Sequence, residues 1–170
     1  MKRIVFYSIT ILSAIIFFGC SSSSVDKKKM AEMVQKHIQC NLTPNNKLTK
    51  LEISEPDSTY GVLCLPQEQL EYIAKSIDNL SNHIMKRTSN MQDFSKVDTK
   101  TAYLANKQMQ ASAYAADLFA YSQMRNKFNG WYIRARFTVT YGKNVVQIEK
   151  WFFFNKEGDI IYNTFELPIP

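Results

Sequence analysis

Residues 131–141 alternate between apolar and polar side chains, and this alternation restricts most strongly what the chain can fold into. Successive side chains of a β-strand point to opposite faces of a sheet, so the pattern predicts a strand with one apolar face. Turn-forming residues at 142–144 and 156–159 separate this segment from two further apolar segments, 145–155 and 160–167. The sequence therefore predicts a C-terminal three-stranded antiparallel meander.

The alternation also predicts how the first two strands of the meander pair. A two-residue turn at 143–144 places Arg136 opposite Trp151 and Arg134 opposite Phe153. In this register the apolar positions of the two strands coincide except at Lys150, whereas a slip by one residue mixes the two faces. One face then holds the core residues Ile133, Ala135, Phe137, Phe152 and Phe154.

The opposite face of these two strands combines arginine with aromatic side chains: Arg134, Arg136, Trp151 and Phe153. This composition is enriched at the hot spots of protein interfaces. Two interpretations are open. Either another part of the chain covers this face, or the face is exposed and these four residues form a partner-binding surface.

Three helices are predicted before the meander. Residues 28–39 have apolar side chains at helical spacing, and residues 70–84 do so in steps of three and four after Pro66. Residues 101–127 contain neither glycine nor proline, and Asp98 or Thr99 can cap this long helix. Residues 50–54 and 60–65 are predicted to form a hairpin around a turn at 56–58. The predicted fold class is α+β, with two to three helices packed on an antiparallel sheet.

The N-terminus has the features of an export signal. Lys2 and Arg3 precede fifteen uncharged, mostly apolar residues, and Gly19 and Cys20 follow. Fifteen helical residues extend about 22 Å, which is short of the roughly 30 Å hydrocarbon core of a bilayer. We therefore expect a lipoprotein signal peptide at 1–19, a lipidated Cys20 with a flexible tether at 20–29, and a single domain at 30–170, the alternatives being plain secretion or an uncleaved anchor.

Cys40 and Cys64 are the other two cysteines. An exported chain meets an oxidising compartment, where two remaining cysteines commonly pair. We predict a disulfide between them, the alternative being two separate buried thiols.

No catalytic or metal-binding pattern stands out in the sequence. His37 and His83 are the only histidines, and neither has ligands at metal-site spacing. Nucleophile-elbow, zincin, P-loop and dinucleotide-binding motifs are missing. Without Lys2 and Arg3 the chain keeps 19 basic and 15 acidic residues, a mild excess spread along the sequence. We expect a protein that is not an enzyme, takes no cofactor or metal, and does not bind nucleic acid.

The chain resembles the small uncharacterised lipoproteins of Bacteroidota in Gly19-Cys20, in the segment 57–61 and in the segments 131–141 and 149–158. A long helix before an antiparallel sheet is also similar to cystatin-like and NTF2-like folds. The resemblance implies a lipid-anchored location in the cell envelope, at the outer membrane, facing the periplasm or the cell surface. It implies no activity, because such folds host unrelated functions.

Two functions are expected from different classes. The first is a membrane-tethered binding or assembly module with an envelope protein as partner. The alternative is a small-ligand-binding or hydrolytic domain with a pocket between the long helix and the sheet. A pocket with convergent polar groups at that place would favour the alternative.

Overall fold

A computed structural model describes residues 25–141 and 144–170 of the chain. The predicted signal peptide, the predicted lipidation site Cys20 and residues 20–24 of the predicted tether lie outside these residues. The elements follow the order α1 (Lys27–Cys40), β1 (Asn46–Ile53), β2 (Asp57–Thr59), α2 (Gln67–Thr88), a short 3₁₀ turn (Phe94–Lys96), α3 (Thr99–Gln123), β3 (Gly130–Tyr141), β4 (Asn144–Asn155) and β5 (Ile161–Ile169).

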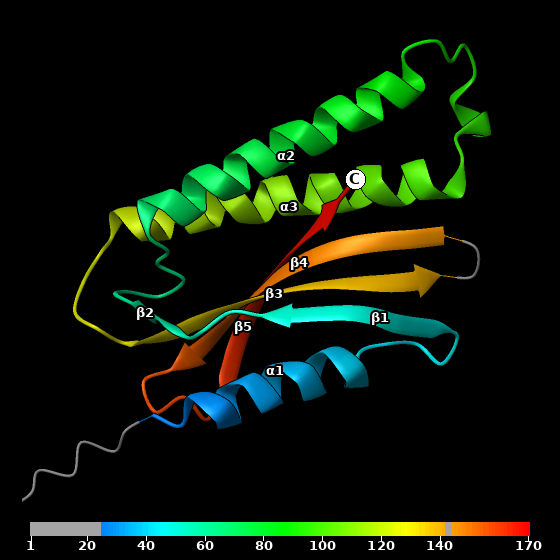
Figure 1. Ribbon diagram of the computed structural model, residues 1–170. Helices are drawn as coiled ribbons and strands as arrows, with labels where there is room; N and C mark the ends of the chain where they lie inside the picture. Colours follow the sequence, from blue (N-terminus) through cyan, green and yellow to red (C-terminus); the bar gives the residue numbers. More distant parts are fainter. Residues whose placement is uncertain (1–24, 142–143) are drawn as a thin grey trace, which may run out of the picture.

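The strands form one antiparallel sheet that lies between two helical layers. The strand order is β1-β3-β4-β5, and β2 pairs with β3 beyond the end of β1. Helix α1 covers one face of the sheet, and α2 and α3 cover the other (Figure 1). The predicted α+β class is confirmed, together with the C-terminal meander of β3, β4 and β5.

Each face of the sheet has its own hydrophobic core. Strand alternation directs Ile133, Ala135, Phe137, Phe152 and Phe154 toward Met30, Val34 and Ile38 of α1, as the sequence predicts for this set of strand residues. The second core lies under α2 and α3 and contains Leu70, Ile73, Leu80, Leu104, Ala111, Ala115, Leu118, Trp151, Phe153 and Phe165. Strand β4 is central and buried on both faces, which explains its continuous aromatic run.

The predicted register of β3 and β4 is wrong by two residues. Arg134 pairs with Trp151 and Arg136 pairs with Glu149. Tyr141 pairs with Asn144, so the chain reverses one residue earlier than predicted. Moving a hairpin turn by one residue shifts the pairing by two, which leaves every side chain on its predicted face.

The predicted hairpin of residues 50–54 and 60–65 does not form. Residues 57–59, which overlap the predicted turn at 56–58, form β2, and both β1 and β2 pair with β3 along the same edge. Ser54 connects the two pairings, because its backbone N–H donates to the carbonyl oxygen of Arg134 at 2.8 Å and its hydroxyl accepts from the Arg134 N–H at 3.0 Å. Residues 60–65 lead from β2 into α2 instead.

The helix ends follow local chemistry. The side chain of Asp98 accepts a hydrogen bond from the Thr101 N–H at 3.0 Å, so Asp98 is the predicted cap of α3. Helix α3 ends at Gln123, before the predicted end at 127, because the next residues turn back toward β2 and bond to Thr59 and Tyr60. Within the described residues, none of the helices has the length and the apolar character needed to cross a bilayer.

Candidate functional site

The predicted partner-binding surface is not exposed as a unit. Trp151 and Phe153 have no exposed surface, because the apolar stripes of α2 and α3 lie over them. Trp151 packs against Phe165 and Tyr72, with ring centroids 5.3 and 6.3 Å away, and its indole N–H donates to Oε1 of Gln69 at 3.4 Å. Of the two interpretations of this face, the prediction of an exposed partner surface is wrong, since the chain covers its own aromatic strand.

The two arginines of this face lie at the rim of the second core and are occupied there. Nε and Nη2 of Arg136 donate to Oε1 of Glu149 at 2.9 and 2.6 Å, and the Tyr72 hydroxyl donates to Oε2 of Glu149. The Arg134 guanidinium lies over the Tyr72 ring, 5.3 Å from its centroid. This arginine cluster joins α2 to β3 and β4.

Electrostatics shows how the arginine cluster is held together. Glu149 is 1% exposed, and a carboxylate at that depth needs partners that satisfy its oxygens. Burial, followed by the hydrogen bond to Glu149, raises the pKa of the Tyr72 hydroxyl, and the bond to Glu149 raises the pKa of Arg136. Arg136 is paired with Glu149, whereas Arg134 lies over the Tyr72 ring and adds a second positive charge to the cluster.

The predicted disulfide is also wrong in this structure. Both cysteines are free thiols: Cys40 is exposed at the end of α1, and Cys64 is buried. The Cys64 thiol lies 4.0 Å from the carbonyl oxygen of Ser122 in α3, within the layer of α2 and α3. The sheet separates this layer from α1, and a disulfide needs Cβ atoms that nearly touch.

A pocket of about 240 Å³ lies between the end of α1, the sheet and α3. We call it the α1–α3 pocket. Polar atoms contribute slightly more of its surface than apolar atoms, and the polar groups come from four different elements or their ends. The lining residues are Ile38, Asn41, Leu42, Tyr103, Lys107, Phe137, Val139, Ile148, Lys150 and Glu166.

Three charged side chains meet in the α1–α3 pocket. Nζ of Lys107 donates to Oε1 of Glu166 at 2.7 Å, and Nζ of Lys150 lies 3.5 Å from Oε2 of the same carboxylate. The side chains of Lys150, Glu166 and Lys107 are 15, 27 and 31% exposed. Two ammonium groups therefore share one carboxylate in a partly desolvated site.

The fold positions these three charges in two ways. Lys150 and Glu166 are directly opposite each other on β4 and β5, so both point to the α1 face. Lys107 belongs to α3 on the other side of the sheet and reaches past β5, which is an edge strand. Tyr103, one turn earlier in α3, packs against both cores and contributes to the same wall of the pocket.

The net field in the α1–α3 pocket is positive. Burial alone would raise the pKa of Glu166, but the hydrogen bond to Lys107 and the charges of Lys107 and Lys150 outweigh it and lower that pKa. Burial and the charge of Lys150 lower the pKa of His37, which packs edge-on to Phe152 at 5.4 Å. The groups around the pocket thus favour a carboxylate and disfavour a further cation.

Sequence reasoning missed this pocket, although one signal pointed to it. Lys150 is the exception among the apolar positions of the predicted core face of β4, and a charge on an apolar face calls for a partner. Glu166 lies opposite Lys150 on the next strand of the predicted meander, but Lys107 could not be found from the sequence, because it reaches the site from α3 around the edge of the sheet.

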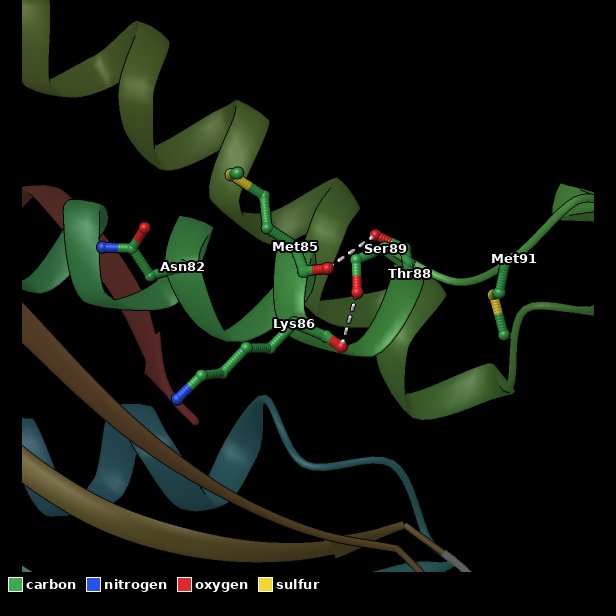
Figure 2. A pocket seen from close by; sticks show the side chains of 6 residues that line it. All are labelled: Asn82, Met85, Lys86, Thr88, Ser89 and Met91. Atoms are coloured by element: carbon green, nitrogen blue, oxygen red, sulfur yellow. Dashed lines mark hydrogen bonds between the residues drawn. The ribbon is translucent and has the colours of Figure 1, made fainter.

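A larger hollow of about 700 Å³ lies beside the C-terminal end of α2. Figure 2 shows its lining side chains, all from one short stretch of the chain: Asn82, Met85, Lys86, Thr88, Ser89 and Met91. The hydroxyls of Thr88 and Ser89 are used in capping, since they donate to the carbonyl oxygens of Met85 and Lys86 at 3.4 Å (Figure 2). Polar side chains from separate elements do not converge there, so the smaller α1–α3 pocket is the candidate functional site.

The comparisons with protein-family models, curated proteins and solved structures found no match to this chain. The resemblance to Bacteroidota lipoproteins and to cystatin-like and NTF2-like folds stays a prediction. Among the described residues, no three His, Cys, Asp or Glu side chains are grouped so that they could hold a metal ion. The geometry of the α1–α3 pocket is therefore the basis of the functional argument.

Proposed function

We propose that the chain is a lipid-anchored protein of the cell envelope whose domain binds a small ligand in the α1–α3 pocket. The observation that carries this proposal is the convergence of Lys107, Lys150 and Glu166 on a pocket that also has an apolar wall. Ligand sites commonly combine apolar walls with a few polar groups from separate elements.

Burying these charges in the pocket lowers the stability of the fold, so their presence calls for a functional explanation. Lys150 is 15% exposed on a sheet face whose other residues, apart from Glu166 beside it, are mostly apolar, and desolvating an ammonium opposes folding. An apolar side chain at position 150 would pack against the same core at no such cost. A binding role accounts for retaining a charge there, and supports a binding module over a purely structural network.

The groups of the pocket suit binding better than catalysis. Lys107 and Lys150 are paired with Glu166, and His37 contacts Phe152 rather than a hydroxyl or thiol nucleophile. These groups can orient a ligand through hydrogen bonds and charge. A hydrolytic role would need a nucleophile next to a base.

The location in the envelope is proposed from the N-terminal sequence. The basic start, the short apolar segment and Gly19-Cys20 support export and acylation of Cys20. The run of serines at 21–24 suits a tether, and the three lysines at 27–29, in the first turn of α1, suit a position beside anionic headgroups. The lipid bilayer is then the first partner of the protein.

Ligand screening with a blocked pocket tests the proposed function. The mature lipoprotein in nanodiscs is screened against a library of small metabolites by ligand-detected NMR. Leu42→Trp narrows the pocket from its half-buried rim, and Val145→Trp is the matched control on an exposed position of β4. We expect ligands that lose binding in Leu42→Trp and keep it in Val145→Trp. A library without such ligands would contradict the proposal.

A second candidate function is assembly with an envelope protein, and a different surface favours it. Tyr60, Val62, Tyr121 and Met124 are 37, 55, 38 and 61% exposed around the end of α3. The Arg125 guanidinium lies over the Tyr60 ring, 5.0 Å from its centroid. Aromatic, methionine and arginine side chains are enriched at interfaces. A photo-crosslinker at position 62, with position 86 as control, tests for a specific protein neighbour in intact cells.

A further inference from the structure

We infer that the ligand of the α1–α3 pocket is a small carboxylate with a short apolar chain. Its carboxylate accepts hydrogen bonds from Lys150, and its chain lies on the wall formed by Phe137 and Ile148. This inference rests on the proposed function and specifies the ligand class of the same site.

The charge balance of the pocket calls for an anion. Lys107 and Lys150 carry two positive charges against the single negative charge of Glu166. The titratable groups that face this cluster are His37 on α1 and Tyr103 on α3. Burial and Lys150 favour the neutral form of His37, and a tyrosine is neutral at pH 7, so neither balances the second ammonium. A bound monoanion would do so.

Hydrogen-bond geometry identifies Lys150 as the donor. Lys107 has a short contact of 2.7 Å with Glu166, whereas Lys150 reaches the other oxygen only at 3.5 Å. An ammonium has three donors, and this long bond uses one of them poorly. The Lys150 ammonium also lies over the Phe152 ring, 5.7 Å from its centroid. Lys150 therefore keeps donors for a ligand.

The remaining walls determine the rest of the ligand. Ile38, Leu42, Phe137, Val139 and Ile148 line the pocket beside the charged groups. A volume of about 240 Å³ is below the range of roughly 300–1,000 Å³ that holds drug-sized ligands. A bare anion such as phosphate would leave the apolar wall unused, and a neutral hydrocarbon would leave the second ammonium unbalanced. A short aliphatic carboxylate balances the second ammonium and also covers the apolar wall.

Calorimetry with matched probes tests the ligand class. The mature lipoprotein in nanodiscs of phosphatidylcholine is titrated with hexanoate, and separately with acetate, inorganic phosphate, 1-hexanol and hexylammonium. We expect hexanoate to bind at least tenfold more tightly than each of the other probes. Equal or tighter binding of 1-hexanol or hexylammonium, abolished by Leu42→Trp, would overturn the anionic ligand but leave the proposed function intact. Failure of hexanoate to bind overturns the inference, and the library screen then decides the proposed function separately.

Two variants that remove charges of opposite sign distinguish a binding role of Lys150 from a structural role. Lys150→Met keeps most of the length of the side chain without its charge and should weaken hexanoate binding at least tenfold, while Lys156→Met on the exposed turn after β4 should leave it unchanged. Glu166→Gln removes the competing carboxylate and should tighten hexanoate binding by roughly threefold or more. Unfolding curves of each variant confirm that it folds. Unchanged or weaker binding in folded Glu166→Gln would overturn the inference.

A second nanodisc composition distinguishes a free carboxylate from a membrane lipid. Phosphatidylglycerol in the nanodiscs offers anionic headgroups and acyl chains next to the anchored domain. We expect the affinity for hexanoate to stay the same in both compositions at high salt, because a free carboxylate enters from solution. Competition by phosphatidylglycerol would assign the pocket to a lipid and overturn the inference of a free ligand.

Discussion

Lys107 and Glu166 are joined by a hydrogen bond of 2.7 Å although Lys107 belongs to the helical layer on the opposite side of the sheet. The lysine reaches its partner around β5, an edge strand that also contains Pro168. Edge strands invite pairing with other chains, and proline and covering side chains prevent it. The same contact thus protects the edge of the sheet and closes one wall of the α1–α3 pocket.

Acid should weaken the fold through Glu166. Its pKa is lower in the folded protein than in the unfolded chain, so its contribution to stability is complete above about pH 5 and is lost as the pH falls through the folded-state pKa. Urea unfolding at several pH values should show wild type more stable than Glu166→Gln at pH 7, with the difference shrinking below pH 4. A difference that is constant with pH would contradict the ion pairing.

Trp151→Ala should be strongly destabilising. Trp151 is completely buried between α2 and β5, so truncation leaves a cavity and costs about 3–5 kcal/mol of unfolding free energy. The control Val145→Ala changes an exposed residue of the same strand and should cost less than about 0.5 kcal/mol. Chemical denaturation measures both. A small loss of unfolding free energy in Trp151→Ala would instead indicate that this face is exposed and available to a partner.

The two cysteines of the domain should differ in reactivity. Cys40 is exposed and Cys64 is buried beside α3, so a thiol reagent should label Cys40 in the folded protein and Cys64 only after unfolding. Intact mass of the mature protein, without reductant, measures the number of labels. Cys40→Ser should remove the label of the folded state. If neither thiol reacts before reduction, even in denaturant, the two are joined.

Cys20 should carry the lipid anchor. The basic start, the apolar segment and Gly19-Cys20 predict acylation of its thiol, and Cys20→Ser removes the acceptor. Cells grown with a clickable fatty acid should label the wild type and not the variant, and only the wild type should fractionate with envelope membranes. Equal labelling of both proteins would mean that the anchor lies elsewhere or is not formed.

Much of the fold could be predicted from periodicity. The stripes of α1 and α2, the cap of α3 at Asp98 and the alternation of β3 and β4 are local patterns, and the structure places these elements close to their predicted positions. The predicted register of β3 and β4 was wrong because turns at neighbouring positions keep the same residues on the same faces. The hairpin at 50–65 failed because β2 pairs with β3, which is distant in sequence.

The candidate site could be predicted only in part. Arg134 and Arg136 were identified on the correct face, but the cover over Trp151 depends on where α2 and α3 pack. Glu149 was overlooked because the incorrect register placed it away from Arg136. Lys150 was the one visible irregularity of the core face. Its neighbours come from separate elements, so only the tertiary structure brings the α1–α3 pocket together.

The position of a bound ligand tests the central claim most directly. Intermolecular NOEs can be measured between hexanoate and the methyl groups of the mature protein. The account predicts NOEs from the hexanoate chain to Ile38, Val139 and Ile148, which line the α1–α3 pocket, and their loss in Leu42→Trp. NOEs to Met85 and Met91 of the larger hollow instead, or none to the three pocket residues, would contradict it.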